Sequence, residues 1–342
     1  MAVNAAVELP VAEALAWFDT LPQDQRLRSL APDFGQADTH RADGLSCVHV
    51  GFEEGEARWL NTLHLRSVPG FGWAAISPYG YGGPLCNSED PAFIRRAWDA
   101  YQAWARTRAV LGEFCRFHPE APHQRFFLGD VRANRATISV DLQVQPPESQ
   151  FNTLARRKLK RTAGVPVRWS RHADDWRAFG EFYRRAMAAM GAHERYHFGD
   201  DYFAAIAGLE GAELCICGEG ADWLSAGVYL FQRALPNDAQ PGGTLEYHLG
   251  ASSGAGHAIG SAYRLQHAAA LEGAARGLVQ LYLGGGTGTD PDNPLLFYKR
   301  AFSRRERVFH VGNAVHDEAL YDAFARSRGY DRESAPTHLL FD

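Results

Sequence analysis

The second half of the chain separates into helices and strands by the spacing of its apolar residues. Residues 174–190 repeat large apolar side chains at helical spacing before Gly191, which predicts an amphipathic helix. Further helices are predicted at residues 150–163, which are strongly basic, and at residues 260–276. Short apolar runs predict strands at residues 213–218, 224–231, 244–250 and 279–283. Because a helix joins the last two strands, we expect them to pair in parallel.

The first half of the chain predicts a further mixed unit of helices and strands. Strands are expected at residues 45–52, 59–68, 73–77 and 136–144, and a helix at residues 91–111. The turn-rich joint QPPES follows the last of these strands. We therefore predict two domains, residues 1–145 and 146–314, and expect the C-terminal tail, about residues 315–342, to pack back on the first domain. A chain of 342 residues suits two domain cores better than one.

Composition narrows the class of protein. The net charge is −5 and 46% of the residues are hydrophobic, yet no stretch is apolar enough to span a bilayer. The N-terminus shows no basic segment ahead of an apolar one, so the sequence predicts a cytoplasmic protein without a signal peptide. Five cysteines, an odd number in a long chain, argue against a disulfide framework. Cys215 and Cys217 are interpreted as small core residues of one strand face.

The stretch LYLGGGTGTDPDNPLLFYKRAF, residues 281–302, combines a glycine run with an isolated lysine. Gly284, Gly285 and Gly286 follow an apolar strand, but they lack the Gly-Lys-Ser/Thr end and the helix of a P-loop. They also lack the pattern of a dinucleotide-binding loop. Glycines at a strand end either form a tight turn or let a ligand approach the backbone. Both readings of the run stay open at this point.

Lysine is rare in this sequence. Among 35 Lys and Arg residues, the lysines are Lys158, Lys160 and Lys299, and the last stands apart from the other two. Lysine carries a compact charge and can release its proton, which arginine cannot do. Lys299 is therefore a candidate for a functional cation, with an ordinary surface position as the alternative.

The segment HERYH, residues 193–197, matches the H-E-x-x-H pattern of zinc proteases. That chemistry needs both histidines on one face of a sustained helix and a third ligand further on. Gly191 and Gly199 bracket the segment, and no third ligand follows at a suitable spacing. We interpret it as a polar loop after a helix and predict no metal site and no bound cofactor.

Several runs, in this order along the chain, resemble the Fem-type aminoacyltransferases of the GNAT-like acyltransferases. They are SVDLQVQPPESQFNTLARRKLKRTAGVPVRW, FGEFYRRAMAAMGAHERYHFGDDYFAAI, TLEYHLGASS, and LYLGGG followed by LFYKRAF. In the first half, ISPYGYGGPL is similar to a substrate-side loop of many relatives. The resemblance implies an α/β (α+β) protein of two tandem GNAT-like domains, each with a mixed central sheet flanked by helices. The first domain would serve the acceptor and the second the donor.

The resemblance also implies where the chemistry takes place. In GNAT-like domains two parallel strands splay apart and receive the donor, and here these would be residues 244–250 and 279–283. Lys299 is the candidate that stabilises the oxyanion of acyl transfer, with nearby aromatic rings shielding it from water. No side chain stands out as an obligatory general base. The residues expected to contact substrate are Ser77, Tyr79, Tyr81, Tyr247, His248, Gly284, Gly285, Gly286, Phe297, Tyr298 and Phe302.

Two basic clusters are candidates for binding a nucleic-acid donor, with solvated basic faces as the alternative. The first comprises Arg156, Arg157, Lys158, Lys160 and Arg161, and the second comprises Lys299 with Arg300, Arg304, Arg305 and Arg307. Because the second cluster adjoins the predicted donor site, we favour a function for it over the first.

The donor loop departs from the acyl-CoA pattern Gln/Arg-x-x-Gly-x-Gly/Ala. Only Gly260 and Ala262 fit it, and His257 takes the first place. We therefore predict transfer of an aminoacyl group from aminoacyl-tRNA to an amine of a peptidoglycan precursor or small metabolite. An acyl-CoA-dependent N-acyltransferase is the alternative, and a non-catalytic acceptor-binding protein of the same fold is the third possibility.

Overall fold

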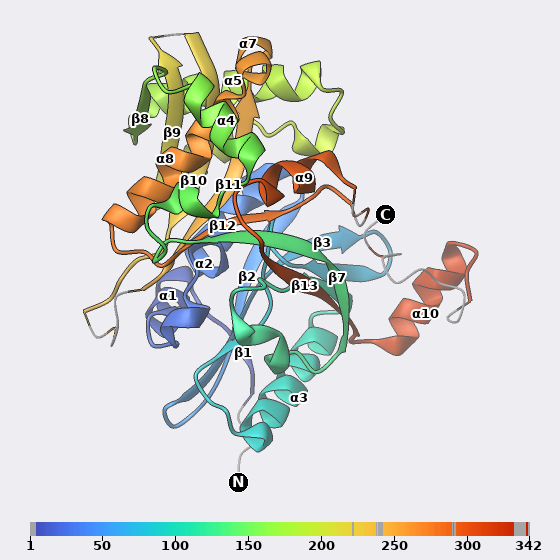
Figure 1. Cartoon of the computed structure of the whole chain (residues 1–342). Helices are drawn as coiled ribbons and strands as arrows, with labels where there is room; N and C mark the ends of the chain where they lie inside the picture. Colours follow the sequence, from blue (N-terminus) through green and yellow to red (C-terminus); the bar gives the residue numbers. More distant parts are fainter. Residues whose placement is uncertain are drawn as a thin grey trace. The chain divides into compact units, whose positions relative to one another are not determined.

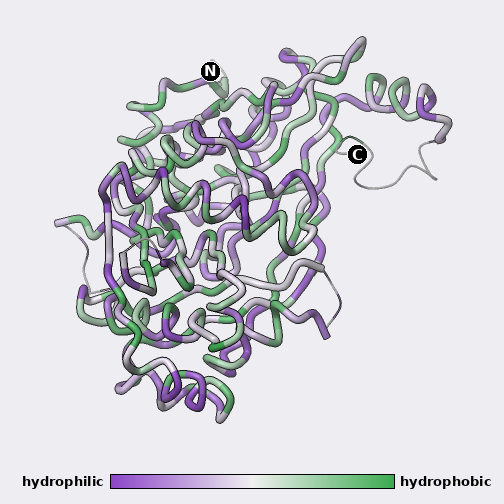
Figure 2. Tube along the Cα trace, turned by 90° about the horizontal axis from the view of Figure 1, so that it is seen from above, coloured by the Kyte–Doolittle hydropathy of each residue, from purple (hydrophilic) through white to green (hydrophobic). Residues whose placement is uncertain are grey.

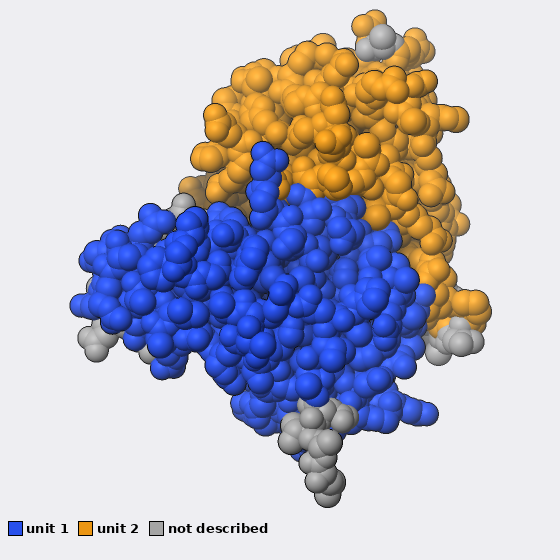
Figure 3. All heavy atoms as spheres, turned by 180° about the vertical axis from the view of Figure 1, so that it is seen from behind, with its two compact units in different colours: residues 1–39, 43–134, 309–342 blue, residues 40–42, 135–308 orange. Residues whose placement is uncertain are grey.

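The computed structural model describes residues 5–220, 222–236, 238, 242–288, 290, 292–331 and 340. The chain forms two compact units (Figure 3). Unit 1 comprises residues Met1–Thr39, Asp43–Asn134 and Phe309–Asp342, and unit 2 comprises His40–Ala42 and Arg135–Val308. The unit boundaries thus fall after residues 134 and 308, whereas the sequence placed them at 145 and 314.

Unit 1 is built on a mainly antiparallel sheet with the strand order β1-β2-β3-β4-β6-β13. Its one parallel pair among the described strands is β4 with β6, joined through helix α3. The elements in chain order are β1 (Val7–Glu8), α1 (Val11–Phe18), α2 (Pro32–Asp38), β2 (Leu45–Glu54), β3 (Ala57–Val68), β4 (Gly72–Ile76), β5 (Leu85–Cys86), α3 (Pro91–Thr107), β6 (Val110–Arg116), the second part of β13, and α10 (Glu318–Ser327).

Unit 2 has the strand order β7-β12-β11-β10-β9-β8, with α4 and α8 on one face and α5 and α6 on the other (Figure 1). Strands β7 (Asp130–Asp141) and β13 (Arg305–Val315) carry the chain from one unit into the other. The remaining elements are α4 (Thr153–Arg161), β8 (Val167–Ser170), α5 (Ala173–Ala189), α6 (Asp200–Ala207), β9 (Ala212–Glu219), β10 (Asp222–Phe231), β11 (Thr244–Ser252), α7 (Gly254–Ile259), α8 (Ser261–Ala275), β12 (Gln280–Gly285) and α9 (Pro294–Arg300).

Most predicted elements are present, and the predicted fold class is confirmed. The last two predicted strands are β11 and β12, and they pair in parallel as expected. The helix predicted over residues 91–111 ends early, at Thr107, because Ala109 has a φ of 53° and strand β6 starts at Val110. The sequence analysis did not predict several elements: β1, α1, α2, β5, β6, β8, α6, α7, α9, β13 and α10.

Helix α3 shows how the apolar pattern becomes a core. Asp90 caps its first turn by accepting hydrogen bonds from the amides of Ala92 and Phe93, and Pro91 suits the first helical position. The buried face of the helix is made of large side chains at helical spacing, among them Phe93, Ala97, Trp98 and Tyr101. The alternation of hydrophobic and hydrophilic positions along such helices can be followed in Figure 2. No described helix is long and apolar enough to cross a membrane.

A buried carboxylate sits in the core of unit 1. Glu113 on β6 accepts hydrogen bonds from Tyr101 Oη at 2.7 Å and from Asn61 Nδ2 at 3.2 Å. His316 Nε2 lies 3.4 Å from the same carboxylate. A buried charge of this kind is tolerated only while its hydrogen-bond donors are kept.

Tyr101→Phe should therefore destabilise unit 1 by about 1–3 kcal/mol, because it removes one donor from a buried carboxylate without changing the packing of the ring. Tyr330→Phe, at an exposed tyrosine of the same unit, is the matched control. Denaturant titration of the whole chain measures both. Equal unfolding midpoints for the two variants would contradict a structural role of the Glu113 hydrogen bonds.

Candidate active site

Strands β11 and β12 separate after a short parallel ladder. The ladder pairs Thr244 with Gln280, Leu245 with Leu281 and Glu246 with Tyr282, and it ends there among the described residues. The register of β11 against β10 shifts at this point and leaves His248 as an extra residue in β11. The register of β12 against β7 shifts between Tyr282 and Gly284. Because a bulge bends its strand, one bulge in each strand at the same level separates the two strand ends.

Helix α9 places Lys299 at this separation. Asn293 caps the helix by accepting hydrogen bonds from the amides of Leu295 at 3.0 Å and Leu296 at 3.3 Å. The Lys299 side chain turns inward: the residue is 7% exposed and its Nζ donates a hydrogen bond to the Gly285 carbonyl at 2.7 Å. The same Nζ lies 6.0 Å from the ring centroid of Tyr247 on β11. The amine thus stands between residues that belong to the two separating strands.

The glycine run makes this position possible. Gly284 has a φ of +75°, and a Cβ there would lie 3.3 Å from Lys299 Nζ. A Cβ on Gly286 would lie 2.6 Å from Asn293 Oδ1, the atom that caps α9. The two readings of the run that the sequence left open are therefore connected, because the same glycines form the turn and allow the close approach of Lys299 and Asn293.

Burial lowers the pKa of Lys299 to about 7. Desolvation disfavours the ammonium form, and the structure places no carboxylate beside Nζ to offset this among the described residues. Lys299 can therefore change its charge near neutral pH, and an anion formed beside it would favour the protonated form.

The aromatic residues around Lys299 differ from the prediction. Phe297 is 62% exposed, so the expectation that it shields the amine from water is wrong. Phe302 is fully buried and packs against Phe151 at a centroid distance of 5.2 Å. Tyr298 donates a hydrogen bond to the Ala262 carbonyl at 3.0 Å. Tyr298 and Phe302 therefore belong to the core between α4, α8 and α9, and the Tyr247 ring lies 6.0 Å from the amine.

The predicted substrate-side loop belongs to unit 1, where it closes the parallel strand pair. The β4–β6 ladder runs to Ile76 and Phe114 without separating, and the amide of Ser77 continues it by donating to the Phe114 carbonyl at 3.0 Å. Ser77 is buried, and its Oγ accepts a hydrogen bond from the Arg116 amide at 3.2 Å. The structure therefore gives Ser77 a supporting role in the sheet.

The two tyrosines of this loop are also held by unit 1. The amide of Tyr79 donates to Asp38 Oδ2 at 2.7 Å, and the ring of Tyr81 packs edge-on against His118 at 4.5 Å. Both side chains are half-buried. Tyr79 and Tyr81 belong to unit 1, whereas Lys299 belongs to unit 2. The contact of the two tyrosines with an acceptor therefore stays a prediction.

The two basic clusters differ in how far acidic residues neutralise them. Arg300 pairs with Glu306 at 3.0 Å, and Arg305 lies 3.8 Å from Asp141, so the second cluster is partly neutralised. The first cluster lies on α4, and none of its members forms an ion pair with a residue that the structure describes: Arg156, Arg157, Lys158, Lys160 and Arg161. Its cations are exposed except for Lys158, which is half-buried. The preference for the second cluster stays a prediction, and the first cluster is the one whose cations have no acidic partner among the described residues.

The segment between β11 and α8 forms a helical turn, α7, in which the amides of Gly256, His257 and Gly260 are bonded within the turn. Ser253 Oγ accepts from the Gly256 amide at 3.1 Å, and the Gly260 amide donates to the Gly256 carbonyl at 2.8 Å. The His257 amide donates to the Ser253 carbonyl at 2.9 Å. A Cβ on Gly260 would lie 2.6 Å from Lys158 Cδ, so the Lys158 side chain covers this glycine. These amides cannot also cradle a pyrophosphate without breaking α7.

The HERYH segment is a short turn. Residues Glu194–Tyr196 form one 3-10 turn, and His193 Nδ1 accepts a hydrogen bond from the Arg195 amide at 3.3 Å. The histidines therefore do not lie on successive turns of an α-helix, and the predicted polar loop is confirmed. Among the described residues no group of three or more His, Cys, Asp or Glu side chains could hold a metal ion.

One residue near the site was not identified from the sequence. Tyr202 on α6 is fully buried, and its hydroxyl lies 2.7 Å from Nε2 of His248, the extra residue of the β11 bulge. Burial lowers the pKa of His248 to about 4, so its imidazole is uncharged at neutral pH. The segment HFGDDYFAAI carried the only sequence signal, an aromatic spacing that was not recognised as a helix.

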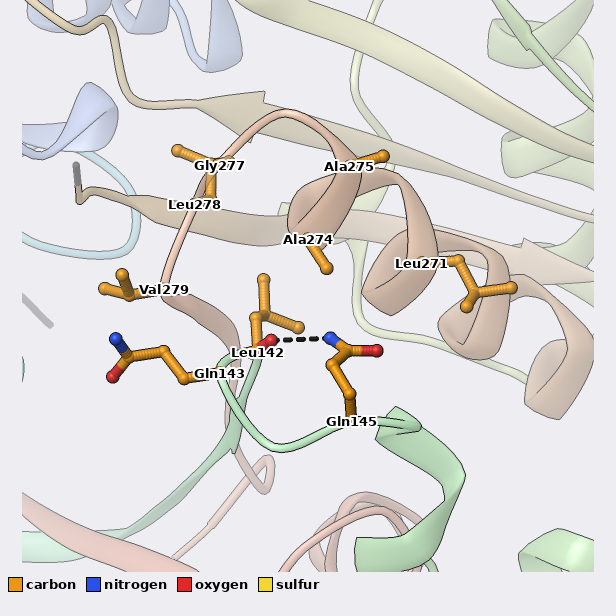
Figure 4. A pocket seen from close by; sticks show the side chains of 9 residues that line it. All are labelled: Leu142, Gln143, Gln145, Leu271, Ala274, Ala275, Gly277, Leu278 and Val279. Carbon is orange, nitrogen blue, oxygen red and sulfur yellow. Dashed lines mark hydrogen bonds between the residues drawn. The ribbon is translucent and has the colours of Figure 1, made fainter.

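A cavity of about 670 Å³ lies at the other end of β12, away from Lys299. Figure 4 shows that its lining comes from the end of α8, the loop between α8 and β12, and the residues after β7, among them Leu142, Leu271, Leu278 and Val279. Gln145 Nε2 donates to the Leu142 carbonyl at 2.7 Å on its rim. No predicted site residue lines this cavity.

Lys299→Met should alter the pH dependence of stability. A lysine whose pKa falls from 10.5 unfolded to about 7 folded destabilises the fold below about pH 7, and the penalty disappears as pH rises toward 10.5. The variant should therefore gain stability relative to the wild type near neutral pH, on the order of a few kcal/mol, and lose this gain toward about pH 10. Denaturant unfolding of both proteins across this range measures the difference. A difference that is constant with pH would contradict the burial of a titrating amine.

Comparison with known proteins supports the fold. No known family model matches the sequence, and no curated protein matches it. Among solved structures, FemX is 10% identical, covers 93% of this chain and 99% of its own, and has a TM-score of 0.67. The C-terminal domain of a putative lysylphosphatidylglycerol synthetase from Agrobacterium fabrum is 14% identical, with coverage of 95% and 99% and a TM-score of 0.56.

A tandem GNAT protein from the clavulanic acid biosynthesis pathway is 14% identical, covers 91% of this chain and 98% of its own, and has a TM-score of 0.52. Each match extends over both units of the chain. The protein therefore has the tandem GNAT-like fold that is shared with FemX and that the resemblance of its sequence implied.

Proposed function

We propose that this protein is an acyltransferase that moves an aminoacyl group from aminoacyl-tRNA to an amine. One observation carries the proposal: the buried Lys299 amine stands at the point where β11 and β12 separate. Strands that part expose backbone groups to a donor chain, and a lysine beside them can stabilise charge on the donor carbonyl. An amine on a peptidoglycan precursor or on a small metabolite would be the acceptor.

The transfer follows from the chemistry of an activated acyl group. The acceptor nitrogen attacks the carbonyl carbon of the aminoacyl ester, and negative charge develops on the carbonyl oxygen. Collapse of this intermediate breaks the bond between the acyl carbon and the ribose oxygen and leaves an amide. Lys299 in its ammonium form binds the oxyanion more strongly than the neutral carbonyl, so it lowers the barrier for this step.

Two features of unit 2 favour a tRNA donor over acyl-CoA. The exposed cations of α4 have no acidic partner among the described residues and can contact phosphates. In α7 the amides of Gly256, His257 and Gly260 are bonded within the turn, and the Lys158 side chain covers Gly260, which disfavours a pyrophosphate there. α4 is also joined to α9, because the Asn152 amide donates to the Ala301 carbonyl at 2.9 Å. The basic helix and Lys299 are thus parts of one packed region.

Acyl-CoA is the second candidate donor. The similar tandem GNAT protein was described in a form without AcCoA, and that wording associates the protein with this thioester. The two candidates separate when the protein is incubated with a charged tRNA pool and, in parallel, with a panel of acyl-CoA thioesters. Each arm contains a lysine-bearing pentapeptide and a set of small amines, and mass spectrometry detects amide formation. Acceptor binding without amide formation in either arm would indicate a non-catalytic binding protein.

Lys299→Met should lower turnover with the active donor by about 10²–10³-fold, as loss of one oxyanion-stabilising group does. Lys299→Arg should restore little, because a planar guanidinium cannot occupy the small buried site of an ammonium. Arg95→Met, an exposed cation on α3 in unit 1, is the matched control and should keep wild-type turnover.

The pH profile provides a second check on the same role. Because burial lowers the pKa of Lys299 to about 7, kcat/KM should fall as pH rises through this value in the wild type. The Lys299→Met variant should lose this limb of the profile. Near-normal turnover of Lys299→Met would show that the amine takes no part in the transfer.

Donor binding should depend strongly on salt if the donor is tRNA, because each phosphate contact releases counterions. Arg157→Ala combined with Arg161→Ala, which lie one turn apart on α4, should weaken binding and reduce the slope of log K against log salt by about 1–2. The control is the Arg95→Ala and Arg106→Ala pair on α3, which are exposed arginines of unit 1. Filter binding of charged tRNA at several salt concentrations measures the slopes, and identical slopes for both pairs would exclude a tRNA contact by α4.

A further inference from the structure

Strand β11 sends neighbouring residues to the two faces of the unit 2 sheet at the place where β11 and β12 separate. Tyr247 packs with the core cluster beneath α8, and Lys299 Nζ lies over its ring on that side. His248 contacts Tyr202 on α6, which covers the opposite face. A donor carbonyl lying between the separated strand ends would therefore have a cation on one face and an imidazole on the other.

Tyr202 holds this imidazole firmly. Its ring is fully buried and stacks on Phe198 at a centroid distance of 4.4 Å, and Phe198 in turn stacks on Tyr183 of α5 at 5.9 Å. Its hydroxyl reaches His248 Nε2 at 2.7 Å. In the tautomer whose Nε2–H donates to this hydroxyl oxygen, the rigid tyrosine fixes the orientation of the ring and Nδ1 keeps the lone pair that can accept a proton.

The bulge explains why a polar ring can occupy this place in a strand. Because His248 is the extra residue of β11, it falls outside the register in which β11 pairs with β10. Bulges redirect one side chain and are frequent beside active sites. The Lys299 amine and the His248 imidazole are therefore positioned by the same pair of strand distortions that separates β11 from β12.

We propose that His248 accepts the proton that the acceptor amine loses during transfer, and that Tyr202 is its positioning residue. This inference rests on the function proposed above. The amine nitrogen forms a bond to the acyl carbon, its proton passes to His248 Nδ1, and the bond between the acyl carbon and the ribose oxygen breaks. The imidazolium then returns the proton to the ribose oxygen, so that the ring ends the cycle uncharged.

The low basicity of His248 is compatible with this role. Burial keeps the imidazole uncharged at neutral pH, which is the form that can take a proton. The nitrogen of the addition intermediate carries a positive charge before it loses its proton, and it is then far more acidic than a free alkylammonium. Proton transfer to His248 is therefore less unfavourable than from a free alkylammonium, and the fixed orientation of the ring offsets part of its low basicity.

The test compares His248→Gln and Tyr202→Phe with two matched controls, His197→Gln and Tyr196→Phe, from the loop between α5 and α6. Each variant is assayed with a charged tRNA pool and with acetyl-CoA, using the ε-amine of a lysine-bearing pentapeptide as the acceptor probe. His248→Gln should lower kcat by about 10²-fold with little change in KM, as loss of a general base does, and added imidazole should restore part of kcat. Tyr202→Phe should lower kcat by a smaller factor, on the order of 10-fold, and the controls should match the wild type.

The outcomes separate this inference from the function on which it rests. If the wild type forms no amide in either arm, both proposals fail. If the wild type is active but His248→Gln retains kcat, the Tyr202–His248 hydrogen bond is only a tether between α6 and β11. Thermal unfolding of each variant controls for misfolding. If His248→Gln does not fold, Tyr202→Phe decides the question, because this substitution removes a single oxygen from a fully packed ring. Wild-type kcat in Tyr202→Phe would then overturn the inference.

Discussion

The burial of the Lys299 amine constrains everything around it in unit 2. A lysine placed in the interior loses hydration. Among the described residues, a hydrogen bond to the Gly285 carbonyl and the face of the Tyr247 ring offset part of this loss. Such a position persists only if the surrounding elements leave the side chain no exposed alternative. Asn293 fixes the start of α9, and Gly284 leaves room for Nζ beside the strand end. The buried amine is therefore held in place by the cap of α9 and by the glycine run after β12.

The contrast between the two parallel strand pairs explains why the chemistry is assigned to unit 2. In unit 1 the β4–β6 ladder continues through Ser77, whose backbone amide and hydroxyl both bond to residues of β6. In unit 2 bulges interrupt the ladders at His248 and beside Gly284, and the corresponding strands part. The same supersecondary arrangement is thus closed in one unit and open in the other, and a few residues at the strand ends decide which form is adopted.

Sequence reasoning predicted the parts of this arrangement that depend on local patterns. The apolar runs of β11 and β12 and the helix between them predicted a parallel pair, and the rarity of lysine pointed to Lys299. The expectation that Phe297 shields the amine from water was wrong, and Tyr202 was not identified. In both cases the direction of a side chain on a short helix depends on tertiary packing, which residue spacing does not reveal. The choice between the basic clusters had the same limitation. Arg300 pairs with Glu306, which is near in sequence, and Arg305 lies beside Asp141, which is far away in sequence. No local pattern predicts the Arg305–Asp141 pair.

The arrangement of charge along unit 2 also bears on the order of events in transfer. The α4 cations are exposed and unscreened by carboxylates among the described residues, so they act at long range and can attract a polyanionic donor before any close contact forms. Lys299 is buried and acts only at short range, on charge that develops beside it. Because burial brings its pKa near neutrality, the amine need not be fully protonated before the donor arrives, and the oxyanion itself would raise that pKa. In the proposed transfer, attraction of the donor and stabilisation of the transition state would fall to different cations, so substitutions in α4 and at Lys299 should affect different steps.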